Sequence, residues 1–212
     1  TTGRGTADDV DTVQGRPAYE GSNLTPEPAN HEITLSDDGE FFVDSYSTPT
    51  TPALPTLTVE ELRAIVDETH SWGKKVACHA YGGIGLHRAL DGGCDSIEHG
   101  LDLDDAAISQ MLKQGTWYVP TLNVYYTDWA PEDTPEGKRD RLRASAHEVS
   151  FQKALKAGVK IVYGTDMGGI PWTEPVAQDF PRMVEFGMAP MDAILSATSR
   201  AAIMLDMEGK IG

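Results

Sequence analysis

Short apolar runs that end in a histidine or an aspartate recur along the chain and dominate its hydrophobic pattern. His79, His99 and Asp166 close three of these runs, which are rich in small and β-branched residues and bounded by turn signals. That pattern is typical of strands buried on both faces of a parallel sheet. We therefore expect each strand to carry one polar side chain to the edge of the sheet. The runs are residues 75–83, 94–100 and 159–166.

Helical patterns separate the predicted strands. Thr58 and Glu61 form a capping box, in which the threonine hydroxyl and the glutamate three residues later satisfy the first amides of a helix that ends at Gly73. Alternating strands and helices predict a parallel sheet whose ligands lie at the strand ends. Further strands are expected at 40–46 and 116–122, and helices at 58–73, 85–90, 104–114, up to Lys156, 176–186 and 191–205.

The chain divides in two by composition. Residues 1–39 are rich in Gly, Pro, Thr, Asn and Asp and show no sustained period of 2 or 3.6, which predicts a loop-rich N-terminal segment. Regular patterning begins at Glu40 and continues to the last residue. We expect residues 40–212 to form the part of a barrel that carries the strand ends with metal-ligand side chains.

Charge narrows the classes of partner. Seventeen basic against thirty-three acidic side chains give a formal net charge of -16, which argues against general electrostatic binding of nucleic acid or of an anionic membrane. No apolar run approaches the ~20 residues of a membrane-spanning helix, and no signal peptide is visible. The expectation is a cytoplasmic protein with a small-molecule substrate.

Two cysteines bear on the redox state of the core. Cys78 and Cys94 are the only cysteines, and both fall in predicted buried strands. Buried cysteines commonly behave as small apolar residues. We expect two reduced thiols rather than a disulfide.

The strand ends supply a candidate metal site. Imidazoles of His79 and His99 and the carboxylate of Asp166 are a suitable ligand set for zinc or a similar divalent ion. Asp166 is also the candidate catalytic residue, because a carboxylate beside a metal-bound water can take its proton. Tyr81 is placed to donate a hydrogen bond to a substrate carbonyl or carboxylate, although packing explains it equally well. Surface or capping roles are expected for the remaining histidines, His31, His70, His87 and His147.

Ordered motifs resemble those of one known family. Val76-Ala77-Cys78-His79-Ala80-Tyr81-Gly82, Ser96-Ile97-Glu98-His99-Gly100, Val119-Pro120-Thr121-Leu122, Gly164-Thr165-Asp166-Met167-Gly168 and the closing Ala197-Thr198-Ser199-Arg200-Ala201-Ala202 closely resemble the amidohydrolase superfamily, in its imidazolonepropionase-like and prolidase-like branch. The resemblance implies a TIM (β/α)8 barrel to which this chain supplies about strands 4 to 8. His79 and His99 then follow the fifth and sixth strands and bind metal, and Asp166 follows the eighth. It further implies hydrolysis of an amide or related C-N bond with one or two zinc ions.

Two features depart from the pattern of that family. Its His-x-His pair after the first strand is absent, and residues 40–46 contain no lysine to serve as the carboxylated ligand of the fourth strand. Three interpretations stay open. Glu40 or Asp44 substitutes as a bridging carboxylate, the site holds a single metal, or a modified lysine near Phe42 and Val43 is missing from the printed chain.

These observations lead to one function and two alternatives. The first hypothesis is a metal-dependent hydrolase that cleaves the amide C-N bond of a dipeptide or N-acyl amino acid by metal-activated water. The alternatives are a catalytically incomplete barrel half that associates with a complementary chain, and a deaminase or hydrolase acting on a cyclic amidine. Since half a barrel exposes apolar surface to water, we expect the chain to need the missing N-terminal half and to form a homo-oligomer.

Overall fold

The computed structural model describes residues 33–35, 41–45, 57–126, 130–167 and 173–212, with side chains from Leu57 onward. The N-terminal segment 1–39 therefore lies outside the described residues, except for one short strand. No helix in the described part of the chain is long and apolar enough to cross a membrane.

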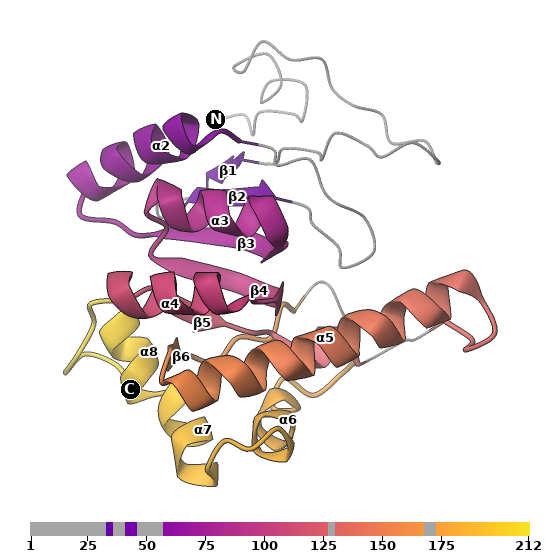
Figure 1. Ribbon diagram of the computed structural model, residues 1–212. Coiled ribbons are helices and arrows are strands. Elements are labelled where there is room, and N and C mark those ends of the chain that lie inside the picture. The colour runs from indigo at the N-terminus through magenta and orange to yellow at the C-terminus, as the bar shows by residue number, and fades with distance from the viewer. Residues whose placement is uncertain (1–32, 36–40, 46–56, 127–129, 168–172) are drawn as a thin grey trace, which may run out of the picture.

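The described strands form one sheet in chain order. The first two strands are antiparallel, and every later pair is parallel. Figure 1 shows the sheet with α2, α3 and α4 following one another along one side. The parallel arrangement expected from the alternating pattern is confirmed. The strands are β1 (Ile33–Leu35), β2 (Phe41–Ser45), β3 (Val76–Gly82), β4 (Ser96–Asp102), β5 (Trp117–Val119) and β6 (Lys160–Ile161).

Helices and strands lie where the sequence predicts them, with changes in one helical stretch and in the length of the later strands. The stretch 191–205 is two helices, because the backbone departs from helical geometry at Thr198. The strand expected at 116–122 ends at Val119 and gives way to the 3-10 turn η1 (Leu122–Tyr125). The strand expected at 159–166 is also shorter, since it ends at Ile161 and does not reach Asp166. The α-helices are α2 (Val59–Ser71), α3 (Gly83–Gly92), α4 (Asp105–Gln114), α5 (Pro135–Ala157), α6 (Asp179–Glu185), α7 (Pro190–Ser196) and α8 (Ser199–Met204).

Side chains cap the helices as their sequences indicate. The capping box at the start of α2 is confirmed, since the Glu61 amide donates to Thr58 Oγ1 (3.1 Å) and the Thr58 amide donates to Glu61 Oε2 (2.8 Å). Asp104 accepts from the Ala107 amide at 2.7 Å and begins α4. These caps satisfy amides that have no partner within the helix.

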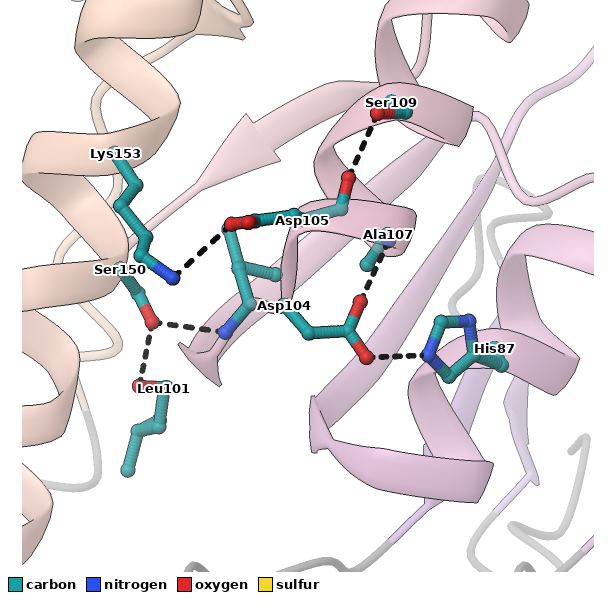
Figure 2. Close-up of polar contacts among 9 residues, drawn as sticks. His87, Leu101, Asp104, Asp105, Ala107, Ser109, Ser150 and Lys153 are labelled. Carbon is teal, nitrogen blue, oxygen red and sulfur yellow. Dashed lines mark hydrogen bonds and ion pairs between the residues drawn. The ribbon is translucent and has the colours of Figure 1, made fainter.

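A polar cluster fixes α5 against the end of β4 (Figure 2). Ser150 on α5 donates to the Leu101 carbonyl and accepts from the Leu103 amide, both at 2.8 Å and both buried. Asp104 Oδ2 also lies 2.8 Å from Nε2 of His87 on α3, where the carboxylate accepts a hydrogen bond from the imidazole. The chain segment that leaves β4 is therefore tied to two helices, which limits its freedom just beyond His99.

The expectation of two reduced cysteines is wrong. Cys78 and Cys94 form a disulfide with Cα atoms 6.0 Å apart, and both are buried in the core. Sequence reasoning weighed the burial of each cysteine but not their proximity, which arises because β3 pairs with β4 and Cys94 precedes β4 by two residues. Disulfides persist mainly in oxidising compartments, so the cytoplasmic localisation stays a prediction.

The disulfide should stabilise the fold measurably. Closing a loop between residues 16 apart is expected to contribute about 3 kcal/mol to the free energy of unfolding. We expect no free thiols in the denatured, unreduced chain by thiol titration, and a loss of that size in urea unfolding after reduction. A Cys78→Ala/Cys94→Val variant is the control, because reductant should leave its stability unchanged. Two titratable thiols in the unreduced chain would contradict the bond.

Candidate active site

The rings of His79 in β3 and His99 in β4 lie against each other. Strand β3 pairs with β4 so that Ala80 lies opposite His99 and His79 lies opposite Glu98. The two imidazole centroids are 4.3 Å apart and the planes are inclined at 67°. The structure thus brings together two of the three residues singled out as metal ligands.

Left-handed backbone recurs at or near the ends of three successive strands. His99 lies within β4, and Thr121 and Asp166 come after the ends of β5 and β6; their φ angles are 69°, 48° and 50°. Non-glycine residues rarely adopt this conformation, and it concentrates at functional sites where surrounding structure holds it in place. The repeated geometry turns the chain sharply at each strand end.

The His99 turn is braced from β5. Tyr118, fully buried, donates its hydroxyl to the Gly100 carbonyl at 3.1 Å. A side chain at Gly100 would place its Cβ 2.7 Å from the Tyr118 ring, so the close approach requires glycine. Thr121 Oγ1 lies 2.7 Å from His99 Nδ1, and both residues are buried.

Burial keeps the two histidines neutral. Desolvation lowers the pKa of His79 to about 4. Desolvation also holds the pKa of His99 well below its ordinary value, and the neighbouring His79 and His147 act in the same direction. Imidazoles that are neutral near pH 7 retain the lone pair that a metal or a proton needs.

Aromatic rings extend the histidine pair. The Tyr81 ring lies 4.8 Å from the His79 ring and 5.4 Å from the His99 ring. Tyr125 of η1 lies edge-on to both Tyr81 and His99, with centroids 6.0 and 5.8 Å away. Burial, together with Tyr81 and Asp166, holds the pKa of Tyr125 well above its ordinary value. Two phenol rings therefore flank the imidazoles, and that of Tyr125 is kept neutral.

One histidine contradicts its expected surface role. His147 on α5 is fully buried, and its ring lies 5.0 Å from the Tyr125 ring. Desolvation lowers its pKa to about 3, and backbone groups of His99 and Pro120 offset this only in part. The sequence around His147 is rich in charged residues, so its pattern did not predict that this side chain faces inward. By contrast, His70 and His87 pair with Asp95 and Asp104 at the surface, as expected.

A buried carboxylate anchors the turn after β5. Asp179, at the start of α6, accepts the Asn123 amide at 2.9 Å and also the Leu122 amide. Desolvation raises the pKa of Asp179 to about 6 in spite of these hydrogen bonds. The η1 turn, with Thr121 before it and Tyr125 at its end, is thus held from the segment that follows Asp166.

Asp166 lies near this cluster but does not complete a ligand set. Desolvation raises the pKa of its carboxyl, and its charge acts on Tyr125 and Asp179. Within the described ranges, no group of three His, Cys, Asp or Glu side chains is arranged to hold a metal ion. Paired neutral imidazoles, one with its second nitrogen hydrogen-bonded, fit a divalent ion. The remaining ligands are not assembled from the described residues.

The residues considered as a bridging ligand are not among the described side chains. Glu40 and the side chain of Asp44 fall outside the described residues, as does His31, so the three interpretations of the missing lysine stay predictions. Sequence reasoning did not single out Thr121, Tyr125, His147 or Asp179 as site residues. Only Thr121 carried a signal, because it belongs to one of the ordered motifs.

A parallel α/β sheet with imidazole and carboxylate side chains at successive strand ends is the arrangement of barrel hydrolases. Residues 25–212 match the amidohydrolase family. The chain belongs to that family, and the resemblance drawn from its motifs is confirmed.

Named relatives agree with this assignment. Ochratoxinase of Aspergillus niger is 33% identical over 159 residues, which are 72% of this chain and 32% of that protein. A Xaa-Pro dipeptidase with bound methionine is 36% identical with a TM-score of 0.67, over 76% of this chain and 41% of the other. A structure described as a putative prolidase from Bifidobacterium longum has a TM-score of 0.71 at 26% identity, over 82% and 46% of the two chains. The chain spans about a third of the length of the ochratoxinase.

Asp179 should make the stability of the fold depend on pH. Its pKa rises from 3.8 to about 6 on folding, so its favourable contribution is complete below about pH 4 and is lost as pH rises through about 6. An Asp179→Asn variant is neutral at every pH and still offers an oxygen to the η1 amides. We expect it to gain up to about 3 kcal/mol over the wild type at pH 7 and nothing near pH 3.5, by urea unfolding.

The control for this measurement is Asp67→Asn, which removes one negative charge from the exposed face of α2. It should leave the pH profile of stability as it is in the wild type. An equal effect of Asp179→Asn at both pH values would contradict the role of ionisation.

Proposed function

We propose that this chain carries part of the metal site of a hydrolase that cleaves the amide C-N bond of a small substrate. The observation that carries the proposal is the contact between the neutral imidazoles of His79 and His99 on the neighbouring strands β3 and β4. Family membership supports a hydrolase. The name of the Xaa-Pro dipeptidase points toward a dipeptide substrate, and an N-acyl amino acid is the second substrate that we propose.

His79 and His99 would each contribute one nitrogen to one or two zinc ions. Such an ion acidifies water and polarises a carbonyl. Asp166 would accept the proton of the attacking water, a role for which the raised pKa of its carboxyl is suited. Tyr81, which lies against both imidazoles, would orient the substrate through its hydroxyl.

The rest of the ligand set would come from barrel strands outside those described. Strand β6 pairs only with β5 among the described strands, and large apolar side chains are exposed on α7, on α8 and in the segment that follows α8. We propose that activity requires the complementary barrel half, with a homo-oligomer as the functional form. The exposed apolar residues are Met191, Ile194, Ile203, Leu205, Met207 and Ile211.

Metal removal is the first test of this function. We expect a chelator to abolish turnover of an Xaa-Pro dipeptide or an N-acyl amino acid, and added zinc to restore it. A cyclic amidine assayed in parallel distinguishes the deaminase alternative. Unchanged turnover after complete metal removal would reject the proposal, and turnover of the amidine alone would favour the alternative.

Substitution of a ligand is the second test. His99→Gln should lower kcat/KM by about 100-fold or more, because it forfeits several kcal/mol of transition-state stabilisation. His87→Gln is a matched control, since His87 belongs to a half-exposed pair with Asp104 and lies on α3. That control should keep its activity. Similar losses in both variants would assign the effect to folding and not to the site.

A further inference from the structure

Residue His99 has two nitrogens, and only one can present a lone pair when the ring is neutral. Ligation through Nε2 requires the proton to reside on Nδ1. The choice between the two tautomers is set by the hydrogen bond that the other nitrogen makes. A residue that fixes this proton therefore decides whether His99 is able to bind a metal.

Thr121 is the residue placed to make that choice. Its Oγ1 lies 2.7 Å from His99 Nδ1 in a buried contact. Among the described residues, the His99 ring has no other hydrogen-bond partner. The Thr121 hydroxyl can accept from a protonated Nδ1 or donate to an unprotonated one, so the other ring nitrogen decides the direction. A proton on Nδ1 has an acceptor in Thr121, whereas a proton on Nε2 has no acceptor among the described residues.

The Thr121 hydroxyl is itself held in place. The backbone of Thr121 is left-handed, with φ of 48°, and the two amides that follow it donate to Asp179. On the other side of the contact, Tyr118 holds the Gly100 carbonyl. Both the ring and its acceptor are therefore attached to rigid, buried backbone.

We propose that Thr121 is a positioning residue that keeps the proton of His99 on Nδ1 and leaves Nε2 as the metal-binding nitrogen. The inference rests on the metal role of His99 given under Proposed function. Thr121 acts through His99 alone and need not touch substrate. The hydroxyl oxygen accepts a hydrogen bond from Nδ1–H, and the proton stays on the ring.

The test begins with the metal-free full chain, labelled with 15N-histidine, at pH 7.5. Long-range 1H-15N correlation spectra distinguish protonated from unprotonated ring nitrogens, and a His99→Gln spectrum identifies the His99 signals. We expect Nδ1 of His99 to show the shift of a protonated nitrogen and Nε2 that of an unprotonated one. The opposite pattern in the wild type would overturn the proposal.

Variants then separate positioning from folding. Thr121→Val keeps the shape and removes the hydroxyl, and Thr121→Ser keeps the hydroxyl. Thr116→Val is the matched control, because Thr116 is another buried threonine next to β5, with only a 3.5 Å contact to Gln114. We expect Thr121→Val to lose the Nδ1-protonated pattern and to bind zinc 10- to 100-fold more weakly. Thr121→Ser should restore both properties, and Thr116→Val should change neither.

Each other outcome is also decisive. Unchanged ring shifts or unchanged zinc affinity in Thr121→Val would overturn the positioning role, as would an equal loss in Thr116→Val. A wild-type chain that binds no zinc even when its complementary barrel half is present would contradict the proposed function. The 15N shifts of the metal-free chain would then test, independently of zinc, whether Thr121 keeps the proton of His99 on Nδ1.

Discussion

The pairing of β3 with β4 is the constraint on which the rest of the site depends. It sets His79 opposite Glu98 and Ala80 opposite His99, and the left-handed backbone of His99 breaks the regular pleat and brings its ring against that of His79. A slip of one residue would turn every side chain of the strand to the other face and separate the rings. The disulfide between Cys78 and Cys94 joins the same two segments beneath the site. Register and covalent linkage therefore act on the same pair of strands.

Rigidity at the strand ends has a cost that the core offsets. Left-handed residues at His99, Thr121 and Asp166 each cost about 1 to 3 kcal/mol. The turns persist because buried groups satisfy their backbone, as Tyr118 does for Gly100 and Asp179 does for the η1 amides. Burial of Asp179 is itself unfavourable when it is charged. The site is thus held by interactions that reduce the stability of the fold while fixing its geometry.

Sequence patterns predicted the parallel sheet, most helices and the strands that carry His79 and His99, because each depends on local periodicity or on an ordered motif. The two histidines lie within β3 and β4, however, and not at the ends where the sequence placed them. They did not predict the disulfide, the burial of His147 or the anchoring role of Asp179. Those features arise from contacts between residues far apart in the chain, such as Asn123 and Asp179. Short elements were also misjudged, because left-handed Thr121 interrupts the apolar run after β5.

The arrangement explains why two histidines alone are a partial site. A divalent ion in a hydrolase needs at least three protein ligands and an open position for water, and the described residues assemble two imidazoles. Desolvation already keeps both imidazoles neutral, so metal binding would require no deprotonation of either ring. Thr121, Tyr118 and Asp179 hold one of them before that event. Under the proposed function, the chain would carry a preorganised half of a ligand set, and the affinity of the complete site would depend on how rigidly the other half is presented to it.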